Sequence, residues 1–107
     1  MAINHPEGIG PDGFTGRRAE RVAVNAQVAL RRSGRLGYRV RAFDASPLGC
    51  KLEFVERPRF DERVWVKFDG LDAIEGIVRW IDGFIAGVEF VRPLHPAVFA
   101  ALLPRVA

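Results

Sequence analysis

The stretch RVAVNAQVAL, residues 21–30, alternates aliphatic side chains with small or polar ones along its whole length. Side chains of an extended strand point alternately to opposite faces, so Val22, Val28 and Leu30 would share one face. We therefore predict a β-strand over this stretch, with one face buried in a core and the other face turned outward.

The residues that follow repeat this alternation in short runs separated by turn residues. Ser33-Gly34-Arg35 marks a turn and residues 38–43 alternate again, so we expect a hairpin whose second strand stops at the segment 44–49. Six short strands with regular turns predict a barrel or a sandwich. The remaining strands are expected at residues 50–54, 64–68, 74–81 and 84–91, with a tight turn at Asp82-Gly83 between the last two.

The two ends of the chain differ from this pattern. Residues 1–16 contain four glycines and two prolines, a composition that predicts a flexible tail before a single domain over residues 17–107. Residues 96–103 suit a short C-terminal helix, because its apolar side chains recur at helical spacing. We expect Phe99, Leu102 and Leu103 to cover one side or mouth of the barrel.

The composition excludes several classes of protein. With 107 residues, of which 49% are hydrophobic and 27% charged, the chain has the make-up of one ordinary globular domain. It contains no run of the roughly 18–20 apolar residues that a membrane helix needs, and its N-terminus lacks the pattern of a secretory signal. We therefore expect a soluble cytoplasmic protein without membrane insertion.

Few residues are suited to catalysis or metal binding. The single cysteine, Cys50, cannot form an internal disulfide, and we expect it to be buried as a small hydrophobic residue. His5 and His95 lie far apart, in contexts that suggest neither a metal site nor a catalytic pair. The sequence therefore predicts a protein that is not an enzyme, with no metal and no cofactor.

Basic residues are concentrated in one segment. Residues 17–41 hold eight arginines and one acid, whereas the rest of the chain holds eight basic and twelve acidic residues. Such segregation creates a local positive field that attracts anions. The sequence therefore predicts an anionic partner.

Two short motifs border this basic segment. Arg17-x-x-x-Arg21 precedes the first expected strand, and Asp44-x-Ser46-x-x-Gly49 lies between the second and the third. Together, at this separation and on this strand pattern, they resemble the PilZ domain family. Residues 76–80, residues 87–90 and the C-terminal helix agree with the resemblance, which covers residues 17 to about 103.

The resemblance implies both a fold and a function. The fold would be a six-stranded antiparallel β-barrel, and the ligand would be cyclic di-GMP, a bacterial second messenger. The arginine segment would order over the ligand and change the surface offered to a downstream protein partner. Gly16, which precedes the first motif, favours one ligand per site over a stacked dimer. The implied ligand-binding residues are Arg17, Arg21, Asp44, Ser46 and Gly49, with Arg18 and Trp80 as further candidates.

The residue types suit this ligand. An arginine presents a planar fork of donors that pairs with phosphate or with guanine O6 and N7. Asp44 can accept hydrogen bonds from guanine, Ser46 can bond a phosphate or a sugar, and Gly49 leaves room for a close approach. The alternative for Asp44 and Ser46 is that each caps the turn before Pro47.

Other interpretations stay open at this stage. Basic residues near Tyr38 and Phe43 would suit a small barrel that binds single-stranded nucleic acid, although the paired motifs favour cyclic di-GMP. A PilZ-like adaptor that has lost its ligand is the third function. Of the two tryptophans, Trp65 is expected in the core, and the place of Trp80 is left open.

Overall fold

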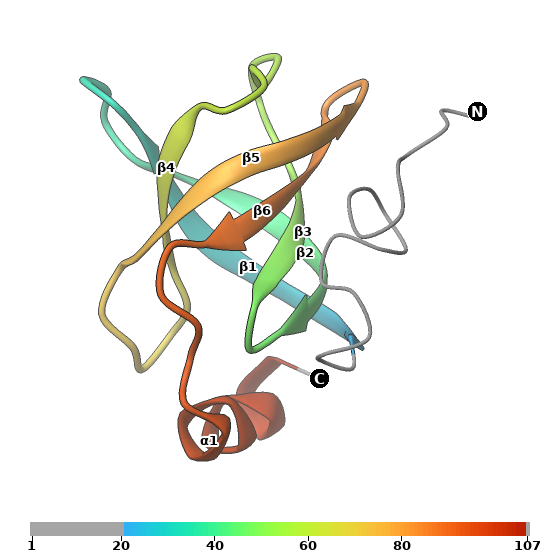
Figure 1. Cartoon of the computed structure of the whole chain (residues 1–107), viewed down its shortest axis with the longest axis vertical. Coiled ribbons are helices and arrows are strands. Elements are labelled where there is room, and N and C mark those ends of the chain that lie inside the picture. The colour runs from blue at the N-terminus through green and yellow to red at the C-terminus, as the bar shows by residue number, and fades with distance from the viewer. Residues whose placement is uncertain (1–20, 107) are drawn as a thin grey trace.

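The alternating stretch at residues 21–30 forms most of β1 (Val22–Arg32), the first of six strands. The computed structural model describes residues 21–106, so the expected tail at residues 1–16 lies outside the described residues. Figure 1 shows the strands wrapped around a common centre, with a helix below them. The other elements are β2 (Tyr38–Ser46), β3 (Gly49–Glu53), β4 (Arg63–Lys67), β5 (Ile74–Asp82), β6 (Ile85–Phe90) and α1 (Pro96–Val106).

The six strands close into a barrel in the order β1-β2-β3-β6-β5-β4. Every pair of neighbours is antiparallel, and β4 pairs back onto β1, which leaves no free sheet edge. The predicted six-stranded antiparallel barrel with a C-terminal helix is therefore confirmed. Because strand direction alternates, the loops β1–β2, β3–β4 and β5–β6 lie at one end of the barrel, away from α1 (Figure 1).

Alternating residues of each strand fill the barrel. Val28 and Leu30 of β1 are buried as expected, and so are Val64 and Val66 of β4. Trp65 lies between these two valines, so its side chain faces out of the barrel, where the Arg31 guanidinium lies 4.2 Å from the ring centroid. The prediction that Trp65 belongs to the core was wrong, because strand alternation prevailed over the preference of tryptophan for burial.

The turn between β5 and β6 differs by one residue from the expected one. Asp82 pairs with Ile85, so the two-residue loop is Gly83-Phe84 rather than Asp82-Gly83. Gly83 has φ 65°, and glycine at the first loop position with positive φ is typical of the tight hairpins that match strand twist. This one-residue difference changes every pairing between β5 and β6.

Helix α1 covers the barrel end near the β2–β3 turn and the β4–β5 loop. Phe99 and Leu102 are buried and Leu103 is half-buried against the core, as expected. The helix continues beyond residue 103 through Pro104, which lacks one backbone donor, and Val106 adds a further buried side chain. Within residues 21–106, no helix is long and apolar enough to cross a membrane.

A buried ion pair fastens the opposite end of the barrel. Arg32, only 4% exposed, donates from Nε and Nη2 to the Glu62 carboxylate, the second bond being 2.7 Å long. The same guanidinium donates to the backbone oxygens of Glu56 at 3.2 Å and Arg57 at 3.1 Å. The end of β1 therefore holds the long β3–β4 loop in place with four hydrogen bonds.

Removing the arginine of this pair should destabilise the protein strongly. Arg32→Met would leave the Glu62 carboxylate without its charged partner, and breaking a buried pair in this way costs about 3–5 kcal/mol. Urea denaturation should show this loss, whereas the control Arg39→Met, on the exposed face of β2, should cost under ~0.5 kcal/mol. Adding Glu62→Leu to Arg32→Met should restore part of the stability. A loss of stability below about 1 kcal/mol in Arg32→Met would contradict the stabilising role of this ion pair.

The same pair should give the stability a defined pH dependence. Burial alone would raise the pKa of Glu62, but hydrogen bonds from Arg32 and from the Arg59 backbone outweigh it and lower that pKa. The contribution is therefore complete above the unfolded pKa of about 4.3 and is lost as pH falls through the lower folded pKa. Denaturation at neutral and acid pH should show Glu62→Gln losing less stability on acidification than the parent. Equal losses in the two proteins would count against this assignment.

Candidate functional site

The motif Asp44-x-Ser46-x-x-Gly49 spans the end of β2, a two-residue turn and the start of β3. Strand β2 continues to Ser46, inside the segment 44–49 where the strand was expected to stop. It continues because of a β-bulge: Ala42 pairs with Leu52, yet Asp44 pairs with Lys51, which leaves Phe43 as an extra residue. The bulge turns both Phe43 and Asp44 to the outside of the barrel.

The strand pairings align a row of residues across the outside of five strands. Asp44 pairs with Ala23 of β1 on one side and with Lys51 of β3 on the other. Lys51 pairs with Gly87 of β6, and Gly87 pairs with Trp80 of β5. Directly paired residues share a face of the sheet. We call the residues Ala23, Asp44, Lys51, Gly87 and Trp80 the outer row.

A second row lies beside the first, nearer the β2–β3 turn. Ser46 lies two residues beyond Asp44 and therefore on the same face; it pairs with Gly49, which pairs with Glu89 of β6. Arg21 immediately precedes Val22, which pairs with Ala45, so the register brings Arg21 to the level of Ser46. The motif spacing thus places Asp44, Ser46 and the half-buried Arg21 on one side of the barrel.

One carboxylate oxygen of Asp44 has no hydrogen-bond partner among residues 21–106. Its side chain is 13% exposed, and Oδ2 lies 3.5 Å from Lys51 Nζ. Oδ1 is buried and has no hydrogen-bond partner among residues 21–106. Asp44 therefore does not cap its own turn, in contrast to the alternative that the sequence allowed. A buried acceptor without a partner costs about 1–3 kcal/mol, which a ligand with a donor would recover.

Ser46 does form the turn. Its side chain is fully buried, and Oγ accepts a hydrogen bond from the Leu48 backbone N–H at 3.0 Å. This is the turn-stabilising role that serines often have, as the alternative interpretation allowed. The hydroxyl proton is not used in this bond, but a ligand would reach the fully buried hydroxyl only after the atoms that cover it move.

Trp80 lies flat against the outside of the barrel. Although Trp80 is only 4% exposed, it does not belong to the interior of the barrel. It pairs with Gly87, and Gly87 faces the opposite side of the sheet from its core neighbours Ala86 and Val88. A Cβ on Gly87 would lie 1.9 Å from Trp80 Nε1, so only glycine leaves room for the indole. Gly87 therefore fixes the position of Trp80 at one end of the outer row.

The cysteine behind Asp44 faces the interior. Cys50 is buried, as the sequence predicted, and pairs with Ala45 and Val88. Burial raises the pKa of its thiol, and the nearby charge of Asp44 raises that pKa further. The thiol therefore contributes packing rather than a reactive group. Among the described residues, no three His, Cys, Asp or Glu side chains form a group that could hold a metal ion.

The structure thus brings together five of the seven sequence candidates: Arg21, Asp44, Ser46, Gly49 and Trp80. Arg17 and Arg18 lie outside the described residues. Sequence analysis did not single out Lys51 or the role of Gly87. If the hairpin loop had been expected at Gly83-Phe84, the sequence would have predicted that Trp80 pairs with Gly87. The loop expected at 82–83 pairs Trp80 with Ile85 instead.

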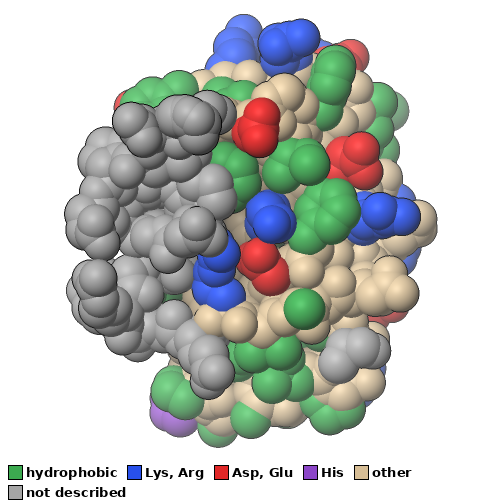
Figure 2. All heavy atoms as spheres, turned by 90° about the vertical axis from the view of Figure 1, so that its right-hand side faces the viewer, with side chains coloured by type: hydrophobic (Ala, Val, Ile, Leu, Met, Phe, Trp, Pro, Cys, Tyr) green, Lys and Arg blue, Asp and Glu red, His purple; other side chains and the backbone are tan. Residues whose placement is uncertain are grey.

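Lys51 was missed for another reason, because only the bulge brings its ammonium beside Asp44. The ammonium also lies 5.8 Å from the centroid of the Phe43 ring. Figure 2 views the molecule from the right-hand side of Figure 1, where basic, acidic and hydrophobic side chains lie interspersed on the visible surface.

Comparison with known proteins agrees with the motif analysis. A family model described as "PilZ domain" matches residues 15–103, which is most of the chain. No curated protein matches the chain.

The fit between Trp80 and Gly87 can be tested directly. In Gly87→Ala the new methyl group would collide with the indole, so Trp80 should move and the protein should lose about 1–3 kcal/mol of stability. Fluorescence in a Trp65→Phe background should report the displacement of Trp80. The control is Gly37→Ala, where a Cβ would meet no atom closer than 3.4 Å. Unchanged emission and stability in Gly87→Ala would refute the contact.

Proposed function

Because the chain belongs to the PilZ domain family, we propose that it binds cyclic di-GMP on the outside of the barrel, at the outer row and the second row beside it. In this proposal the protein is a signalling module rather than an enzyme. Ligand binding changes the surface that it offers to a downstream protein partner. The segment containing Arg17, Arg18 and Arg21 closes over the ligand, with the roles of Arg17 and Arg18 resting on the sequence motif alone.

The unsatisfied carboxylate oxygen of Asp44 is the observation that carries this proposal. Guanine offers N–H donors on its Watson–Crick edge, and an ionised carboxylate is purely an acceptor. Asp44 Oδ1 is buried and lacks a partner among residues 21–106, so a guanine donor would remove an existing energetic cost. This gain is specific to a ligand that carries donors, as a base edge does and a bare phosphate does not.

Residues on either side of Asp44 suit the rest of the ligand. The guanidinium of Arg21 can pair with a phosphate in a charge-assisted, bidentate manner. At the other end of the row, the indole of Trp80 is only 4% exposed, and it would stack on a base once the atoms that cover it move aside. Gly49 and Ser46 lie between the two, where backbone clearance and a hydroxyl are useful. A dinucleotide with two bases and two phosphates matches this sequence of groups.

Acidic residues in the two rows favour cyclic di-GMP over single-stranded nucleic acid. Asp44 is paired with Lys51 and Glu89 with Arg79, so the two rows lack the uninterrupted basic surface that a long polyanion favours. Tyr38, considered as a stacking residue, is half-buried and packs against the core. We therefore retain nucleic acid only as a control ligand. The remaining alternative, an adaptor without a ligand, leaves the buried acceptor of Asp44 without a function.

Calorimetric titration of single variants tests this assignment. Arg21→Ala and Asp44→Ala should each weaken cyclic di-GMP binding at least about tenfold, which is ~1.4 kcal/mol. Asp44→Ala should change the melting temperature little, because Oδ1 makes no hydrogen bond within residues 21–106 and removal of this unsatisfied oxygen offsets the loss of the 3.5 Å ion pair between Oδ2 and Lys51. Ser46→Ala should lose about 0.5–1.5 kcal/mol of stability, since its hydroxyl supports the turn.

The matched control is Arg59→Ala, which removes an exposed arginine from the β3–β4 loop at the end of the barrel away from α1. Its affinity for cyclic di-GMP should equal that of the parent, and the parent should bind one ligand per chain. GTP and a short oligonucleotide should bind far more weakly. Parent-like affinity in both Arg21→Ala and Asp44→Ala would show that the ligand, if any, binds elsewhere.

A further inference from the structure

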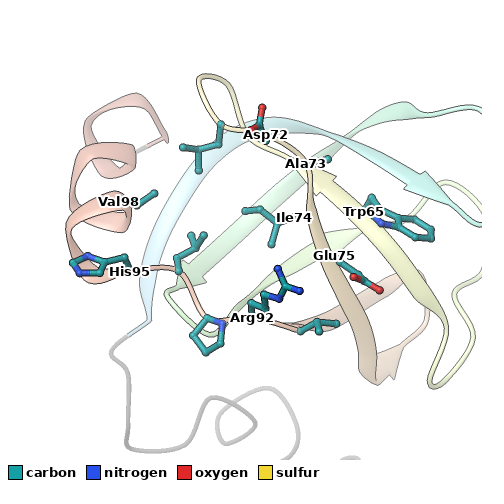
Figure 3. A pocket seen from close by; sticks show the side chains of 12 residues that line it. Trp65, Asp72, Ala73, Ile74, Glu75, Arg92, His95 and Val98 are labelled. Atoms are coloured by element: carbon teal, nitrogen blue, oxygen red, sulfur yellow. The ribbon is translucent and has the colours of Figure 1, made fainter.

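A pocket of about 510 Å³ lies on a different part of the molecule from the two rows. Its walls are the loop between β4 and β5, the linker between β6 and α1, and the first turn of α1 (Figure 3). The volume falls in the range of about 300–1,000 Å³ that is typical of binding pockets. None of the residues that line it belongs to the proposed nucleotide site.

Eight of the twelve residues that line the pocket have apolar side chains. Leu71, Ile74 and Leu94 form half-buried walls that pack against the core on their inner side. Val91 and Val98, also in the lining, remain 46% and 38% exposed. They are two of only six large hydrophobic residues left exposed among residues 21–106. Clustered exposed apolar side chains mark a surface that gains stability when it is covered.

The cation Arg92, which has no ion-pair partner among the described residues, lies among these apolar side chains. Figure 3 shows the Arg92 side chain extending from the linker toward β5, and Arg92 makes no ion pair within residues 21–106. The other polar lining residues are occupied or turned away. Glu75 accepts a hydrogen bond from Arg63, His95 Nδ1 accepts one from the Ala97 N–H at 3.0 Å, and Asp72 points away from the pocket (Figure 3).

From this combination we infer that the pocket is a docking groove for a short segment of a partner protein that presents a large apolar side chain beside a carboxylate. The apolar walls would receive the hydrophobic side chain, and Arg92 would pair with the carboxylate. A chain segment rather than a small molecule is favoured by the exposed valines. A small molecule confined to the pocket would cover only the parts of Val91 and Val98 that line it, whereas a segment that continues beyond the pocket would also cover the rest of these exposed side chains.

The groove is also attached to the motif that carries Asp44. The Leu94 N–H donates to the Pro47 oxygen and the Phe90 N–H donates to the Leu48 oxygen, both at 2.8 Å. Pro47 and Leu48 form the β2–β3 turn inside the motif, so a movement of this turn would be transmitted to the linker wall. The further statement that cyclic di-GMP alters the affinity of the groove rests on the proposed function.

Selection from a phage-displayed library of random peptides of about twelve residues tests the groove. Peptides selected on the full chain should combine a large apolar residue with Asp or Glu. They should bind at least about tenfold more weakly to Arg92→Glu and to Val98→Asp. Arg59→Glu, which makes the same charge change on the distant β3–β4 loop, should bind them like the parent.

Selection on Arg92→Glu provides a second, independent readout, because reversing the charge should enrich Lys or Arg in place of the acids. This readout requires only that the variant is folded, which circular dichroism can show. A library that returns no binder dependent on Arg92 and Val98 overturns the inference. So does an unchanged preference for acids on Arg92→Glu.

The link to the nucleotide is tested with the best selected peptide. Its affinity, measured with and without saturating cyclic di-GMP, should differ by about fivefold or more. Equal affinities would refute the link while leaving the groove established by the library. A failure of cyclic di-GMP to bind at all would appear separately in calorimetry, and it would count against the proposed function rather than against the groove.

Discussion

The single extra residue in β2 at Phe43 determines that Asp44, and with it the proposed site, faces the outside of the barrel. Without the bulge, strict alternation from the buried Ala42 would turn Asp44 into the barrel, among aliphatic side chains that cannot solvate a carboxylate. With it, Asp44 faces outward beside Lys51, and Ala45 returns to the core. The register between β1 and β2 shifts at the same level, so both neighbours of β2 accommodate the change. Everything assigned to the outer face follows from this irregularity.

The rest of the barrel forms a rigid scaffold for the outer face that carries Asp44. Closure of β1 onto β4 removes free edges, and the Arg32–Glu62 pair fixes the loops at one end while α1 covers the other. A rigid scaffold allows an unfavourable feature to persist at a cost of about 1–3 kcal/mol, namely the Asp44 oxygen that has no partner within residues 21–106. Such a feature is expected where a ligand completes the structure, and it lies beside the turn that leads to the apolar groove.

Sequence periodicity was sufficient to predict most of the fold and much less of the site. The six strands followed from period-two alternation, and the buried side of the helix from its spacing of Phe99 and Leu102. The bulge could not be predicted, because no glycine or proline marks Phe43 and the bulge arises from pairing with both neighbouring strands. The outward position of Trp65 could have been predicted, because its neighbours Val64 and Val66 occupy the inner face of the strand. The position of Trp80 depends on the register between β5 and β6. The expected hairpin loop was displaced by one residue, so the expected register was wrong.

The central claim, that the outer row is the nucleotide site, is tested most directly by a ¹⁵N NMR titration of the protein with cyclic di-GMP. The claim predicts large shifts at the indole N–H of Trp80 and at the amides of Gly49 and Gly87, which lie in the two rows. The amides of Gly34 and Gly83, at the far end of the barrel, should stay unchanged. Shifts confined to that far end, or no shift at a saturating ligand concentration, would contradict the account.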